Sequence, residues 1–189
     1  ISCNIYKIRI YAGKKVNNPM ELKDSYQSCL LAKERSFFDQ GSGIIYYEDV
    51  KNRQLNYSFR DNTCYRILLE EIKSCRKENI NALVNDMFDL LQNQNQAPEI
   101  VRACIVSFML DIIKVISEKQ GDAESLFIKS NIVGIQVLMV NDLKRLLYNF
   151  CISSMEYLQN IDKASILDNI AVIESYIQSN YKNYISIKS

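Results

Sequence analysis

A helical period of hydrophobic residues governs the chain from about residue 61 to its end. Apolar side chains recur there every three or four residues, the spacing that places them on one face of an α-helix. The Gln/Asn-rich tract Gln92–Gln96 and the pair Gly121–Asp122 interrupt the period, which predicts loops at both places. We therefore expect about five or six helices packed as an irregular bundle. The predicted inner faces carry Tyr65, Leu68, Leu69, Ile72 and Cys75; Ile80, Leu83, Val84, Met87, Phe88 and Leu91; and Val101, Cys104, Ile105, Phe108, Ile112, Ile113 and Ile116.

The last part of the chain is expected to form two separate helices. The first runs from Asn141 to Leu158, and the second from Ile166 to Tyr181. The second carries isoleucines at alternating four- and three-residue intervals. Such a pair of helices either fills a core or sets the spacing of two subunits. The isoleucines of the second helix are Ile166, Ile170, Ile173 and Ile177.

The first 50 residues have a different pattern, which predicts a β-α-β unit. Residues Ile5–Tyr11 alternate as in a half-buried strand, Asn18 and Pro19 form a helix start signal, and Ile44–Tyr47 has strand composition. Two strands and one helix leave one face of the sheet uncovered, so we expect further N-terminal sequence or a partner chain to cover it. The chain begins with Ile, which indicates a piece of a longer polypeptide. The helix is expected to carry one apolar stripe of Leu22, Tyr26, Cys29, Leu30 and Phe37 and to be closed by Gly41 and Gly43.

The fold class is accordingly mostly α, with a short β-α-β unit followed by the bundle. Residues 1–55 form the α/β unit, residues 56–162 the bundle, and residues 163–189 the last helix and its extension.

Composition excludes several kinds of chemistry. The chain has no histidine, which excludes Ser-His-Asp, Cys-His and His-based zinc sites. Its net charge of +1 gives no basic surface for nucleic acid or anionic membranes. Its cysteines form no C-x-x-C pair and are interpreted as core residues, which favours a reducing, cytoplasmic location. The longest apolar run, 132–140, is too short to span a bilayer. The six cysteines are Cys3, Cys29, Cys64, Cys75, Cys104 and Cys151.

Other residue clusters that resemble functional sites are more simply explained as solvated surface or as packing. The acidic pairs are interpreted as solvated surface, and Gly41-Ser42-Gly43 follows a helix, whereas a dinucleotide loop follows a strand. The basic residues Lys14, Lys15, Lys33 and Arg35 also favour a solvated face. The aromatic residues predict either packing between the two parts or a ligand pocket or subunit interface. The acidic pairs are Glu48/Asp49, Glu70/Glu71 and Asp86/Asp89, and the aromatic residues are Tyr46, Tyr47, Tyr57, Phe59 and Tyr65.

Two stretches together resemble parts of a known class of bacterial regulator. Residues 6–50 contain an S-Y-x-x-C helix at Ser25–Cys29 and a G-x-G-I-I-x-Y-x-D strand at Gly41–Asp49, and they resemble the closing part of a degenerate GGDEF-like domain. Residues 173–188 contain Tyr176-Ile177-Gln178-Ser179-Asn180-Tyr181 followed by Ile185-Ser186-Ile187, which resembles the entry to an AraC-type helix-turn-helix domain. Their order matches the middle of AraC-family response regulators.

The resemblance implies a non-catalytic signal-relay and self-association module of a cytoplasmic AraC-type transcription regulator. The chain would end after the first helix of the DNA-binding domain, so it would contact DNA only through a domain that it lacks. A homodimer, a small-molecule effector and no membrane partner are expected. No catalytic, cofactor-binding or metal residue is assigned, because the G-G-[DE]-E-F sequence is absent; ligand-binding residues are unknown, and no cofactor is expected. The alternative is a small-molecule-binding sensor domain of such a regulator.

Overall fold

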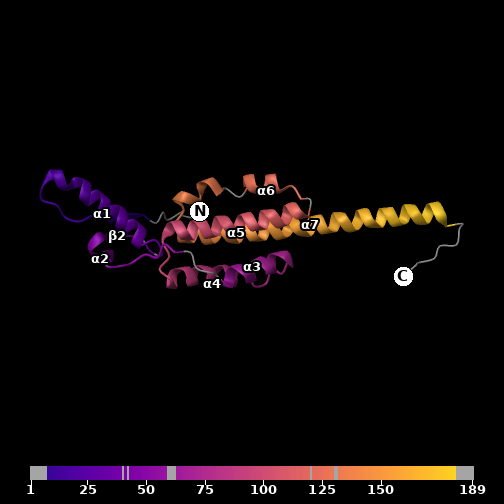
Figure 1. Ribbon diagram of the computed structural model, residues 1–189, viewed down its shortest axis with the longest axis horizontal. Helices are drawn as coiled ribbons and strands as arrows, with labels where there is room; N and C mark the ends of the chain where they lie inside the picture. Colours follow the sequence, from indigo (N-terminus) through magenta and orange to yellow (C-terminus); the bar gives the residue numbers. More distant parts are fainter. Residues whose placement is uncertain are drawn as a thin grey trace, which may run out of the picture.

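The structure is a computed structural model that describes residues 8–39, 41, 43–58, 63–119, 121–129 and 132–181. The protein is mostly α, as predicted. Figure 1 shows an α/β unit at one end, a helical bundle in the middle, and the second half of the last helix extending alone at the other end. The elements are β1 (Arg9–Ala12), the 3-10 turn η1 (Pro19–Glu21), α1 (Leu22–Arg35), β2 (Gly43–Tyr46), α2 (Tyr47–Val50), α3 (Thr63–Lys73), α4 (Ile80–Asn93), α5 (Pro98–Glu118), α6 (Ala123–Lys129), η2 (Ile132–Val137) and α7 (Val140–Asn180).

The predicted β-α-β unit is confirmed, with a first strand that spans Arg9–Ala12; residues 5–7 of the predicted strand lie outside the described residues. Strands β1 and β2 are parallel, with Ile10 opposite Ile44 and Ala12 opposite Tyr46, and α1 connects them. Because side chains alternate along a strand, these four residues share one face of the sheet. Ile10, Ile44 and Tyr46 are about half exposed there, at 54%, 53% and 51%. The described residues therefore leave this face of the sheet uncovered.

Helix α1 begins as its sequence predicts but packs through a different face. Its buried residues are Ser28 and Ala32, whereas Leu22, Tyr26 and Leu30 of the predicted apolar stripe are exposed. Helix α1 has small residues on this face because it lies close to the chain that follows β1. A Cβ atom added at Gly13 would lie 1.9 Å from the Ser25 carbonyl oxygen, and the backbone N–H of Lys14 donates to Ser28 Oγ at 2.8 Å.

The loop after α1 also differs from the prediction. The helix ends at Arg35, ahead of the two glycines that were expected to close it. Gly41 lies in the following loop with φ 142° and Gly43 opens β2 with φ 134°. Both values lie in the region that glycine adopts without strain, so these glycines shape the entry to β2.

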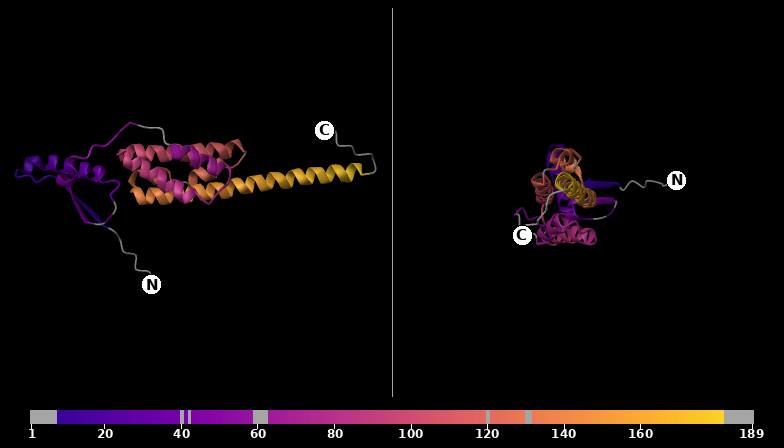
Figure 2. Two further views of the ribbon diagram at one scale, coloured as in Figure 1. Left: turned by 90° about the horizontal axis from the view of Figure 1, so that it is seen from below. Right: turned by 90° about the vertical axis from the view of Figure 1, so that its right-hand side faces the viewer.

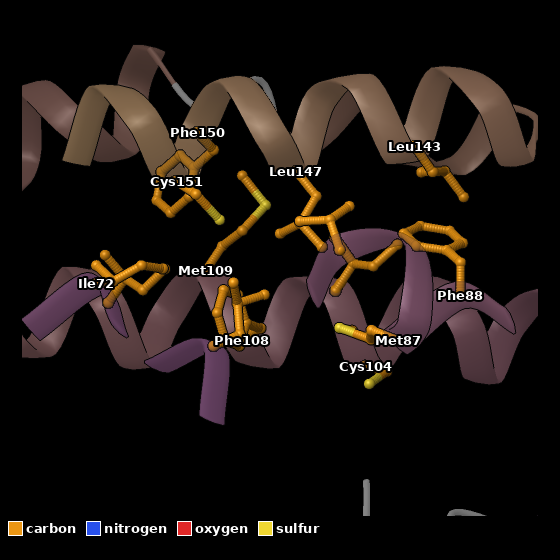
Figure 3. Close-up of a cluster of buried hydrophobic side chains, with 14 of the residues drawn as sticks. Ile72, Met87, Phe88, Cys104, Phe108, Met109, Leu143, Leu147, Phe150 and Cys151 are labelled. Carbon is orange, nitrogen blue, oxygen red and sulfur yellow. The ribbon is translucent and has the colours of Figure 1, made fainter. Parts of the chain in front are cut away.

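Helices α3, α4, α5 and α7 form the bundle core. Figure 2 shows them side by side in two further views, and Figure 3 shows side chains of α5 and α7 meeting with those of α3 and α4 between them. The long apolar face predicted for α5 is confirmed. Its buried residues are Pro98, Val101, Cys104, Ile105, Phe108, Met109, Ile112 and Ile116.

The two expected C-terminal helices are one continuous helix, α7. The segment between the two expected helices, residues 159–165, is mostly polar but includes no proline or glycine, so nothing in it ends a helix. The first half of α7 is buried through Leu143, Leu147 and other residues as far as Leu158. Every residue at positions 162–179 is exposed.

We predict that Phe108→Ala lowers the free energy of unfolding by about 3–5 kcal/mol, because a large cavity replaces a ring in the centre of the bundle. Phe108 is fully buried and makes an edge-to-face contact with Tyr65, with ring centroids 4.9 Å apart. The matched control is Leu110→Ala on the same helix, where the side chain is 45% exposed and the cost should stay near about 0.5 kcal/mol. Urea denaturation followed by circular dichroism measures both, and equal losses would contradict this account of the core.

Candidate functional site

The acidic pairs lie on the surface, and most of their members have a cationic partner. Within the described residues, no group of three or more Cys, Asp or Glu side chains could hold a metal ion. The hydrogen bond from Arg76 lowers the pKa of Glu71. The ion pairs are Lys51–Glu48 at 2.6 Å, Lys73–Glu70 at 2.8 Å, Arg76–Glu71 at 2.8 Å and Lys144–Asp89 at 3.5 Å.

In the glycine-rich loop, a carbonyl oxygen contacts a cationic side chain. Arg9 Nε donates to the Gly41 carbonyl oxygen at 2.8 Å, and the Gly43 N–H donates to the Ile8 carbonyl at 3.1 Å. A phosphate cradle needs free N–H groups aimed at the anion. Gly41 and Gly43 therefore serve the strand entry, and Ser42 lies outside the described residues.

The predicted basic patch is divided among separate contacts. Lys14 lies 3.4 Å from Asp24, while Arg35 donates to the Lys51 carbonyl oxygen and stacks over Tyr47 at 5.9 Å. Lys15 and Lys33 are exposed. These contacts support the reading of a solvated face.

The aromatic residues have unlike surroundings. Tyr65 belongs to the bundle, where its ring packs on Phe108 and its hydroxyl donates to Asp111. Burial is the first cause, and the Asp111 hydrogen bond the second, of a raised pKa for Tyr65. Tyr46 and Tyr57 are exposed, and Phe59 lies outside the described residues. The described aromatic residues therefore do not form one cluster between the α/β unit and the bundle.

The contact between the two parts depends on Phe37, which follows α1. It is 2% exposed and belongs to the hydrophobic core of the bundle. Arg102 of α5 lies over its ring, with Cζ 5.2 Å from the centroid, and Arg102 Nη2 donates to the Leu138 carbonyl at 3.3 Å. The loop before α3 adds backbone bonds to the α4–α5 turn: Asn56 N–H donates to Asn95 O at 2.7 Å, and Ala97 N–H donates to Asn56 O at 2.9 Å. From the sequence, Phe37 was expected only as part of the apolar stripe of the first helix.

A cavity of about 260 Å³ lies beside this contact. Charged side chains of both signs face an apolar wall in it. Burial, followed by the charge of Glu99, raises the pKa of Glu34, and burial lowers the pKa of Arg102. The lining includes Leu30, Lys33, Glu34, Phe37, Glu99 and Arg102.

The second half of α7 carries more exposed large hydrophobic residues than any other element of the described chain. Ile166, Ile170, Ile173 and Ile177 are 46–58% exposed, and Val172 is 69% exposed. The sequence had predicted this stripe, but as part of a separate helix. Its position beyond the bundle follows from the uninterrupted course of α7, which carries it away from every helix that could cover it.

No family model matches the chain, and no curated protein and no solved structure matches it. None of the helices in the described part of the chain combines the length and apolar character that crossing a bilayer requires.

The buried cysteines generate a prediction about reactivity. Burial raises the pKa of Cys104 to about 11 and that of Cys151 to about 12. Because the thiolate is the reactive form, a maleimide at pH 8 should label both at least about 100-fold more slowly in the folded chain than in urea. Half-buried Cys29 is the internal comparison. Peptide mass spectrometry measures the rates, and rapid native labelling of Cys104 would contradict a structural role for this thiol.

Proposed function

We propose that this chain is a non-catalytic signal-relay and self-association module of an AraC-type transcription regulator. One observation carries the proposal: α7 begins inside the bundle core at Val140 and continues without interruption to Asn180. A helix that is packed at one end and free at the other transmits a movement of its packed end along its whole length.

The first half of α7 is the packed end, and it lies in the core of the bundle. Leu143 and Leu147 are fully buried, and Phe150 is 7% exposed. Close-packed interfaces shift between discrete arrangements rather than deforming continuously. A change at the α/β unit would reach α7 through Phe37 and α5, and would rotate or tilt its far end.

Residues 173–188 resemble the start of an AraC-type helix-turn-helix domain, and such a domain would be moved together with the far end of α7. Regulators that read paired half-sites depend on the spacing of their two reading domains. A module that holds two copies together and reorients α7 would alter that spacing, and hence the affinity for DNA. The charge balance of this chain agrees with DNA contact through another domain.

The cavity beside Phe37 favours a second candidate function, a small-molecule sensor. It has apolar walls and charged groups of both signs, as sites for small polar ligands do. A ligand there would press on the contact that joins the α/β unit to α5. The sensor function would show as a concentration-dependent rise in melting temperature with a small zwitterion, and the relay function does not require it.

We predict that the chain self-associates. Light scattering behind size exclusion, over a wide concentration range, should give a mass approaching twice the 21.9 kDa of one chain. The uncovered apolar surfaces supply the driving force. A mass of one chain at every concentration would contradict the self-association part of the proposal.

A further inference from the structure

We propose that the second half of α7 forms a parallel, two-stranded coiled coil with a second copy of this chain. The contact surface is the isoleucine seam, defined as Ile166, Ile170, Ile173 and Ile177. This inference rests on the self-association proposed above and adds to it the surface, the orientation and the number of strands.

The spacing of the seam matches a coiled coil. Its residues follow one another at intervals of four, three and four, the alternation that keeps apolar side chains on one side of a helix that winds around a partner. Ile170 and Ile177 occupy the a positions of the heptad, and Ile166 and Ile173 the d positions. The polar residues Asp168 and Ser175 fall on the opposite side, at f.

The surroundings of the seam also require a partner. All four isoleucines are 46–58% exposed, and they belong to the half of α7 that extends beyond the bundle (Figure 1). The exposed part of α7 is about five turns long, and most of the stability of a helix in a protein comes from packing its apolar face, which this part of the single chain lacks. β-branched isoleucine lowers helix propensity further when it is not packed. A second copy would supply the missing packing, since the same face on each helix is self-complementary.

The residues beside the seam suit a parallel pair. In that arrangement each g position faces the next e position of the other helix. Asp162 then faces Leu167, Asn169 faces Glu174, and Tyr176 faces Tyr181 of the second copy, so no like charges meet at these flanking positions. A parallel axis also places both α/β units at one end and both C-terminal ends at the other, as a relay requires.

Lys163 at an a position favours two strands over three or four. Isoleucine at both a and d is compatible with larger assemblies, but a lysine within the seam is better tolerated where its ammonium can reach solvent at the edge of a two-helix interface. Its side chain is exposed in the single chain.

The first test compares two substitutions that add the same charge to exposed apolar positions. Ile170→Glu lies on the seam, and Val172→Glu lies outside it, at c, where the side chain is 69% exposed. Ile170→Glu should raise the dissociation constant of the dimer at least about 100-fold, because it buries a carboxylate in the interface. Val172→Glu should leave it within about threefold. Light scattering on the full chain measures the mass against concentration.

The second test fixes the orientation by oxidative cross-linking. Asn180→Cys places thiols at a d position, where the two copies of a parallel pair face each other within disulfide distance. Ser175→Cys, at f, is the matched control, and the unsubstituted chain shows any cross-linking by the native cysteines. We expect a disulfide-linked dimer for Asn180→Cys only, seen on a non-reducing gel.

The outcomes separate this inference from the proposed function. A doubled mass that Ile170→Glu leaves unchanged would keep self-association and overturn the seam. Loss of the dimer in Ile170→Glu without cross-linking of Asn180→Cys would overturn the parallel orientation, and a mass of three or four chains would overturn the two-stranded form. A monomer at all concentrations would overturn both proposals and assign the seam to another occupant, such as the helices that follow in a DNA-binding domain.

Discussion

The packing of α5 against α7 is the interaction on which the rest of the structure depends. Cys104, Ile105, Phe108 and Met109 of α5 have no exposed surface. Figure 3 shows Cys104, Phe108 and Met109 packed among side chains of α7, α3 and α4. Burial of large side chains stabilises a fold by about 1.5–3 kcal/mol each, which makes this layer the main source of stability. It also fixes α7 at one end, so the direction in which the free half of α7 leaves the bundle is set by the same contacts.

The α/β unit depends on this layer too. It reaches the bundle through Phe37, whose ring lies beneath Arg102 of α5, and its own uncovered sheet face makes no compensating contact with other described residues. Helix α5 consequently touches both the unit at one end of the molecule and the helix that forms the other end. A relay between the two ends would pass through α5, and the cavity beside Phe37 lies on that route.

The sequence was sufficient to predict the elements whose signals are local. Asn18 and Pro19 marked the start of the first helix, the pair Gly121–Asp122 marked the break between α5 and α6, and the apolar period of α5 identified its buried face. The features that were missed depend on contacts between distant residues. Close approach of the chain at Gly13 and Lys14 selected small serines on the facing side of α1, and the insertion of Phe37 into the bundle has no local signature. The prediction of two separate C-terminal helices was wrong because the mostly polar segment between them contains no proline or glycine, and polarity alone does not end a helix. The proposed function and its surface remain predictions.

The central claim is that the free half of α7 is held helical by a second copy. Amide hydrogen exchange at low and high protein concentration tests it directly, because exchange reports local opening residue by residue. The account predicts that protection of residues 166–177 rises with concentration, while the protection of α5 stays constant. Protection of residues 166–177 that is the same at both concentrations, in a chain whose mass does not change, would contradict it.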